Sequence, residues 1–138
     1  MVEAVLVYIE VPRGTHRKRE WRPAAGRLVT EYLSPFPSPF NYGCVRDRPG
    51  ADGDPADALV LGPRREAGSE LLVRVRGVVD FLDAGLEDPK LVCSGSPVGP
   101  DERRLVERFF RSYAWARRFV NRLQGKSGDT GLRGVEWS

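Results

Sequence analysis

The sequence is poor in the residues that build metal, redox and disulfide frameworks. It holds two cysteines, Cys44 and Cys93, and their wide separation matches neither a disulfide framework nor the spacing of a zinc site. We expect both to be reduced thiols in a cytoplasmic protein. The one histidine, His16, lies in a polar stretch rich in Arg and Lys, where we expect an exposed side chain without a chemical role.

Long apolar runs are also missing from the chain. No run approaches the ~20 residues that span a membrane, and the N-terminus has neither the basic region nor the small-residue cleavage site of a signal peptide. Residues 94–96 read Ser-Gly-Ser, but they precede a predicted helix and lack the strand–turn–helix setting of a nucleophile elbow. We therefore expect no membrane partner and no serine hydrolase of that type.

The length and charge of the chain limit its organisation. Its 138 residues correspond to a single domain, residues 1–138, which can bury a sizeable core. The net charge of +3 combines 22 basic with 19 acidic side chains, a balance that suits phosphates or nucleic acid. The acids concentrate at residues 52–57 and 80–88, whereas the arginines concentrate at residues 13–22 and in the last third.

Short strand-like runs fill the first two thirds of the chain: residues 4–11 are rich in β-branched residues, and residues 17–22 alternate with a period of two. Three prolines, Pro35, Pro37 and Pro39, forbid regular structure between two of these runs. The pattern predicts a meander of short strands that forms a small barrel. We expect strands at residues 4–11, 17–22, 27–33, 57–61, 70–79 and 90–93, with a short strand or loop at residues 41–49.

One amphipathic helix is predicted at residues 101–124, with Pro100 at its start and Gly125 at its end. Its seven arginines predict a solvated basic face, with nucleic-acid binding as the less favoured alternative. The Gly-rich tail at residues 126–138 is only marginally patterned, and no element is assigned to it. The apolar positions form a stripe at helical spacing: Val106, Phe109, Phe110, Tyr113, Ala116, Val120 and Leu123.

Three carboxylates gather within six residues where a loop enters a predicted strand. The stretch reads Asp52-Gly53-Asp54-Pro55-Ala56-Asp57 and directly precedes an apolar run. Because like charges at this density repel, a cation among them would be stabilising, and carboxylate oxygens suit hard ions such as Mg²⁺ or Ca²⁺. An EF-hand does not fit, because Asp57 takes the sixth position, where that loop needs Gly. A solvated acidic loop stays open as the alternative.

Further acids and two lysines extend this cluster if the barrel brings their segments together. Acids with lysines are the composition needed to hold a polyphosphate bridged by several Mg²⁺ ions. Two such ions about 4 Å apart can share a water and lower its pKa, and a neighbouring carboxylate can accept its proton. The additional members are Glu10, Lys18, Glu20, Asp83, Asp88 and Lys90.

Taken in order, these motifs resemble the soluble family I inorganic pyrophosphatases. The resemblance runs from about Val5 to Val92 and more weakly to Tyr113. Residues 52–57 look like the family signature, and Asp83 with residues 88–92 reproduces its D-x4-D-x-K spacing. The other matching segments are residues 9–12, 18–20, 39–43 and 73–78. The resemblance implies a mainly β fold, a five-stranded OB-like barrel with a packed helix.

The resemblance also implies a function and a set of roles. The protein would hydrolyse inorganic pyrophosphate to two phosphates by metal-activated water, with several Mg²⁺ ions for which Mn²⁺ can substitute, in a homo-oligomer. Asp54 would accept the proton of the attacking water, and Tyr42 would orient Asp54. Metal would be bound by Glu10, Glu20, Asp52, Asp57, Asp83 and Asp88, and phosphate by Lys18, Lys90 and Tyr113.

Three positions depart from the family pattern. Tyr32 or Glu31 stands where the family has an Arg, Ser38 replaces a Tyr, and Ala114 replaces a phosphate-binding Lys. A second hypothesis is therefore a weak or inactive pyrophosphatase-like protein that binds metal, a phosphorylated ligand or a protein partner. A third is an OB-like nucleic-acid binder. The candidates to replace the missing cation are Arg22, Arg27, Arg46 and Arg48.

Overall fold

Alternating burial along β1 marks the inner face of a barrel. β1 spans Ala4–Val11, and its Val5, Val7 and Ile9 are buried, as the two-residue period of a strand requires.

The computed structural model describes residues 3–50 and 52–138, so Met1, Val2 and Ala51 of the predicted domain lie outside it. The other elements are β2 (Arg17–Arg22), β3 (Arg27–Leu33), β4 (Asn41–Pro49), β5 (Pro55–Val60), β6 (Glu70–Asp83), β7 (Leu86–Glu87), β8 (Lys90–Ser94), α1 (Pro100–Leu123) and β9 (Gly131–Trp137).

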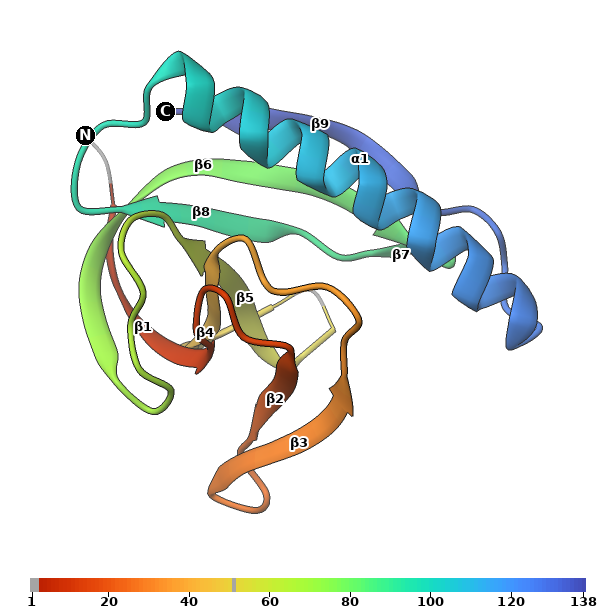
Figure 1. The fold of residues 1–138 in the computed structure, drawn as a ribbon, viewed down its shortest axis with the longest axis horizontal. Coiled ribbons are helices and arrows are strands. Elements are labelled where there is room, and N and C mark those ends of the chain that lie inside the picture. Colours follow the sequence, from red (N-terminus) through yellow and green to blue (C-terminus); the bar gives the residue numbers. More distant parts are fainter. Residues whose placement is uncertain (1–2, 51) are drawn as a thin grey trace.

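Five strands close the barrel (Figure 1). β1 pairs with β4 on one side and β6 on the other, so that the order β1-β4-β5-β8-β6 returns on itself. β5 and β8 run parallel, and the other pairs around the barrel are antiparallel. Closure leaves these strands without the unpaired edges of an open sheet. The predicted five-stranded, mainly β architecture with one packed helix is confirmed.

The predicted strands at residues 4–11, 17–22 and 27–33 are confirmed with the same bounds. β2 and β3 form a separate two-stranded sheet that stands away from the barrel wall (Figure 1). Most of their residues are exposed or half-buried, so this ribbon adds little to the core. It does position charged side chains above one end of the barrel.

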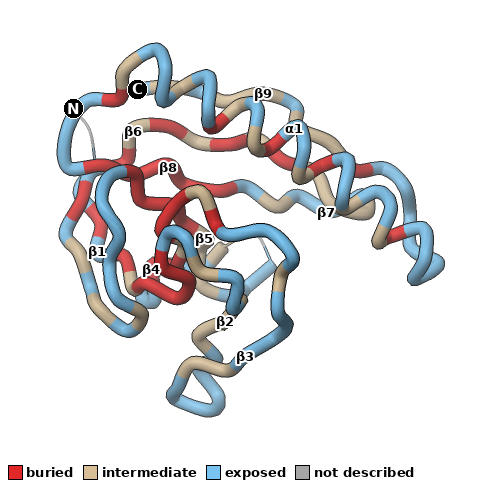
Figure 2. Tube along the Cα trace, in the orientation of Figure 1, coloured by how far each residue is buried: buried red, intermediate tan, exposed pale blue. Residues whose placement is uncertain are grey.

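Two apolar cores hold the molecule together. One fills the barrel, and Figure 2 shows the unbroken burial of β8 and the alternating burial of β6 that line it. The second lies between the sheet and α1, where Phe81 and Phe110 are almost fully buried. Burial of apolar area at about 25 cal/mol per Å² is the main favourable term in such packing. Cys44 and Cys93 are both buried and free, in agreement with the predicted thiols.

The predicted apolar stripe of the helix is wrong in its second half. Val106 and Phe110 are buried as expected, whereas Ala116 is exposed and Leu123 is 73% exposed. The buried position there is Asn121, whose amide binds Asp83 and Thr130. The end of the helix therefore meets Asp83 and Thr130 through a polar side chain. Within the described part of the chain, no helix is long and apolar enough to cross a membrane.

The helix arginines are not all on a solvated face. Arg117 pairs with Asp83 at 3.2 Å, and Arg118 Nε donates to the carbonyl oxygen of Thr130 at 2.6 Å. Both contacts tie α1 to the segments on either side of it. The predicted basic face is therefore interrupted, which weakens the case for nucleic-acid binding along it.

β9 is an element that the sequence pattern did not reveal. Gly131–Trp137 pairs antiparallel with β6, with Trp137 opposite Gly77. Two of its residues are glycines, which lowers its own tendency to form a strand. Its partner is the 14-residue β6, whose paired residues lie 49 to 60 positions earlier in the chain, so no local pattern predicts this strand.

Gly43 lies where β4 comes closest to β1, opposite Ile9. A Cβ at Gly43 would overlap the carbonyl oxygen of Tyr8 and lie 3.1 Å from Ile9 Cα. We expect Gly43→Ala to lower the free energy of unfolding by about 3 kcal/mol, the upper end for overpacking, because backbone atoms cannot rotate away. Urea denaturation measures this change. Gly95→Ala, whose added Cβ meets nothing within 4 Å, should unfold like the parent, and equal losses in both variants would contradict the interpretation.

Candidate active site

A buried lysine joins the two acidic motifs. The parallel register of β5 and β8 places Asp57 opposite Lys90. Lys90 is 4% exposed, and its Nζ lies 2.9 Å from Asp57 Oδ2 and 2.8 Å from Asp88 Oδ1. Burial lowers the pKa of Lys90, but Tyr42, Asp57 and Asp88 raise it by more, so that the pKa lies well above its ordinary value. The lysine therefore stays charged, because its charge is paired.

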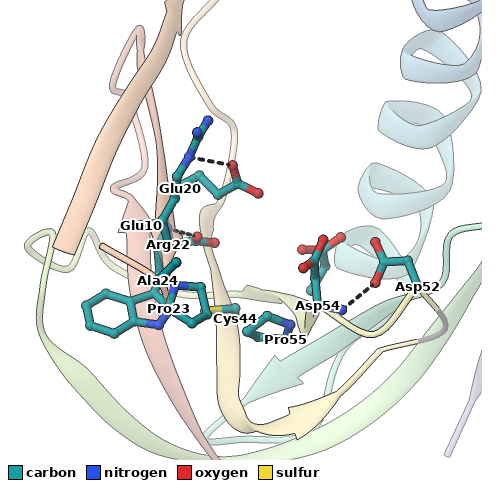
Figure 3. A pocket seen from close by; sticks show the side chains of 11 residues that line it. Glu10, Glu20, Arg22, Pro23, Ala24, Cys44, Asp52, Asp54 and Pro55 are labelled. Atoms are coloured by element: carbon teal, nitrogen blue, oxygen red, sulfur yellow. Dashed lines mark hydrogen bonds and ion pairs between the residues drawn. The ribbon is translucent and has the colours of Figure 1, made fainter. Parts of the chain in front are cut away.

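Carboxylates face one another across a first cavity of about 320 Å³. In Figure 3 the side chains of Glu10 and Glu20 enter from one side, and those of Asp52 and Asp54 lie on the other. The Asp54 N–H donates to Asp52 Oδ1 at 3.0 Å, which fixes the loop between β4 and β5. Asp57 completes the wall, so the cavity gathers five of the predicted acids.

Burial, with smaller contributions from neighbouring acids, raises the pKa of two of these carboxylates, Glu10 and Asp57. Burial, with smaller contributions from Asp57 and Glu20, raises the pKa of Glu10 to about 8, although the Trp21 N–H that donates to it at 2.5 Å acts in the other direction. Burial also raises the pKa of Asp57, where Lys90 opposes the shift and Asp88 adds to it. A cation in the cavity would relieve both the repulsion and part of the desolvation.

The acid set fits divalent metal ions in its chemistry. Asp52, Asp57 and Asp88 line one further cavity of about 240 Å³, and oxygen ligands of this kind suit Mg²⁺. Among residues 3–50 and 52–138, no three His, Cys, Asp or Glu side chains already converge as a metal-binding group. Asp57 and Asp88 each pair one oxygen with Lys90 and keep a second oxygen that could bind a metal ion.

A second cavity of about 240 Å³ adjoins the first and shares Glu10, Glu20 and Asp57 with it. Burial lowers the pKa of Lys18 and raises that of Tyr113, since both lie in its partly desolvated wall. Aromatic rings from Phe40, Phe109 and Phe110 form the apolar part of that wall. The predicted phosphate-binding residues are all brought together here: Lys18, Lys90 and Tyr113.

Tyr42 and Asp54 lie apart. Tyr42 lines the second cavity and Asp54 the first, and no hydrogen bond between them is present in the described structure. The pKa of Tyr42 is raised well above its ordinary value by burial, with Lys90 opposing the shift. The phenol therefore keeps its proton and can act as a donor.

Asp83 is held by the helix and lines neither of the two adjoining cavities. Asn121 Nδ2 donates to Asp83 Oδ1 at 2.8 Å, and the Arg117 guanidinium lies 3.2 Å from Asp83 Oδ2. Sequence reasoning missed both partners because it assigned the arginines of α1 to solvent. Their spacing, four and eight positions after Tyr113, was the available signal, since it puts all three on one helix face.

A comparison with known families identifies the family of this chain. The family model described as inorganic pyrophosphatase matches residues 7–104, which include the second half of β1, all of β2 to β8 and every candidate site residue except Tyr113. The chain therefore belongs to the inorganic pyrophosphatase family.

Relatives and solved structures give the extent of the similarity. The inorganic pyrophosphatase of Gluconobacter oxydans is 38% identical over 90 residues, 63% of this chain and 52% of that protein. That of Geobacillus stearothermophilus is 35% identical over 109 residues, 75% of this chain and 65% of that protein. The chain thus spans about half the length of the first of these relatives. The Thermus thermophilus inorganic pyrophosphatase structure has a TM-score of 0.81 at 25% identity and covers 98% of this chain and 83% of that one.

The raised pKa of Glu10 predicts a pH-dependent stability. The folded protein keeps a proton on Glu10 up to about pH 8, whereas the unfolded chain releases it near pH 4.5. The stability from this proton is complete below pH 4.5 and is lost as the pH rises through 8. In chelator-containing buffer we expect the parent to lose about 2–4 kcal/mol more than Glu10→Gln between pH 5 and 8.5.

Denaturant unfolding at several pH values checks this expectation. Glu66→Gln serves as the control, because its side chain is 82% exposed. The control should follow the parent across the pH range. Parallel curves for the parent and Glu10→Gln would show that the Glu10 proton does not govern the stability.

Proposed function

We propose that the protein hydrolyses inorganic pyrophosphate to two phosphates with the help of bound divalent metal ions. The observation that carries this proposal is the pair of adjoining cavities, one rich in carboxylates and the other containing lysines and phenols, with Glu10, Glu20 and Asp57 between them. Membership of the family, and the named activity of the relatives from Gluconobacter and Geobacillus, supports the same substrate.

The residues that would hold Mg²⁺, or Mn²⁺ in its place, are Asp52, Asp57, Asp88, Glu10 and Glu20. Bound ions of this kind lower the pKa of an attacking water and neutralise phosphate charge. Asp83 would join this set only after it exchanges the Arg117 guanidinium for metal. When Asp57 and Asp88 bind metal, the metal ion would replace the Lys90 ammonium group as their positive partner. Lys90 would then be free to turn to the phosphate.

Side chains of the two cavities would accept the proton of the water and bind the phosphate groups. Asp54, at the wall of the first cavity, would accept the proton of the attacking water. Tyr42 would reach Asp54 only after the carboxylate turns toward the second cavity, so its orienting role belongs to the loaded state. Lys18, Lys90 and Tyr113 would bind the phosphate groups as donors. The phenylalanines of the second cavity would strengthen these contacts by excluding water.

The first test is phosphate release from pyrophosphate in the presence of Mg²⁺. We expect Asp54→Asn and Asp57→Asn each to reduce the rate by about 100-fold or more, because the first loses the proton acceptor and the second a metal ligand. Asp47→Asn, on the exposed outer part of β4, should keep the parental rate.

Two outcomes would count against the proposal. Unchanged rates in both site variants would remove the assigned roles. A parent that binds diphosphate without releasing phosphate, with any divalent metal, would favour the inactive ligand-binding protein instead. The homo-oligomer and the cytoplasmic location stay predictions beside this one.

A further inference from the structure

Of the four arginines expected to replace the missing cation, Arg27 is exposed and lines neither of the two adjoining cavities. The other three have carboxylate partners. Arg46 pairs with Glu70 at 2.6 Å and stacks on the rings of Tyr8 and Trp21. Arg48 pairs with Glu3 at 2.6 Å, and Arg22 lies 3.5 Å from Glu20. Arg46 and Arg48 line neither of the two adjoining cavities and Arg22 lines only the first, so none of the three lies in the wall of the second cavity with Lys18 and Lys90.

Arg19 differs from them in place and in pairing. It lies on β2 and lines the second cavity together with Lys18 and Lys90. Its Nε is buried and has no hydrogen-bond partner within the described chain, and no ion pair of its guanidinium is seen there. A buried donor without a partner lowers the free energy of unfolding by about 1–3 kcal/mol. A ligand that accepts a hydrogen bond from Arg19 Nε would remove this cost.

The ribbon geometry explains how Arg19 comes to this cavity. Lys18 is opposite Tyr32, and Arg19 is opposite Thr30, so Glu31 is the extra residue of an irregularity between them. Lys18, Arg19 and Tyr32 all line the cavity, although strict alternation would send Lys18 and Arg19 to opposite faces. With this irregularity, Arg19 of β2 and Tyr32 of β3 both lie in the wall of the second cavity.

We propose that Arg19 binds the phosphate group of the diphosphate that departs. This rests on the proposed function, in which Asp54 marks the attacked end of the substrate. Because Asp54 lines the first cavity and Arg19 the second, a diphosphate across their shared wall places its other phosphate beside Arg19, Lys18 and Tyr113. The planar guanidinium can donate two parallel hydrogen bonds to that phosphate.

The contact matters for bond breaking as well as for binding. As the water oxygen bonds to the attacked phosphorus, the bond from that phosphorus to the bridging oxygen breaks, and its electron pair stays on the departing phosphate. The water proton goes to Asp54. Arg19 donates to the departing group while its negative charge grows, which stabilises the transition state.

Binding of methylenediphosphonate, a diphosphate analogue that is not hydrolysed, tests the inference without turnover. Isothermal titration in Mg²⁺ would compare the parent with Arg19→Gln, Arg19→Lys and Arg17→Gln. Arg17 is the matched control: it lies on the same strand, is exposed, and its Nε donates to Thr30 Oγ1 at 2.9 Å outside the cavity. Arg17→Gln and Arg19→Gln remove one positive charge each from β2.

We expect Arg19→Gln to weaken analogue binding by about tenfold or more, equivalent to about 1.4 kcal/mol, while Arg17→Gln stays within about twofold of the parent. Arg19→Lys should fall between them, since it keeps the charge but loses the planar fork. Without ligand, Arg19→Gln should melt at the parental temperature or above it, because it breaks no hydrogen bond of the folded chain.

Two results would overturn the inference: binding by Arg19→Gln within about twofold of the parent, or equal weakening by Arg17→Gln. A parent that binds no analogue would overturn it as well. A parent that binds the analogue through Arg19 but releases no phosphate from pyrophosphate would support the inference and contradict the proposed hydrolysis. The two proposals can therefore fail separately.

Discussion

The candidate site depends on the ion pairs of Lys90 with Asp57 and Asp88. Through Lys90 of β8, they connect Asp57 of the neighbouring parallel strand β5 to Asp88 in the loop before β8. Without this cation, two carboxylates would face each other in a partly buried space, at a free-energy cost that a marginally stable domain can hardly bear. The pairing of β5 with β8 places Asp57 opposite Lys90, and the charge of Lys90 offsets the charges of Asp57 and Asp88.

The same logic explains why the site is poised for cations. Glu10 and Asp57 have raised pKa values because burial removes them from water while other acids surround them. The fold thus maintains an excess of oxygen ligands that internal lysine and arginine side chains only partly neutralise. Arg117 at Asp83 and Lys90 at Asp57 are internal counterparts of the metal ions proposed for the loaded state.

Features with a local cause were predictable from the sequence, and features with a long-range cause were not. The period of two in β1 and the density of acid at Asp52–Asp57 are visible in a few residues. β9 depends on pairing with a distant β6, and the Arg117–Asp83 contact depends on where α1 lies across the sheet. Arg19 was overlooked because an irregularity in the β2–β3 ribbon, which no residue type announces, decides which cavity it faces.

We infer that the carboxylates paired with Lys90 take up divalent ions. Diffraction from crystals grown with Mn²⁺, recorded for its anomalous signal, would locate these ions. We expect a peak within about 2.3 Å of carboxylate oxygens from Asp57 and Asp88, with Lys90 moved away from at least one of them. Crystals at millimolar Mn²⁺ with no peak beside Asp52, Asp57 or Asp88, and with both Lys90 ion pairs intact, would contradict it.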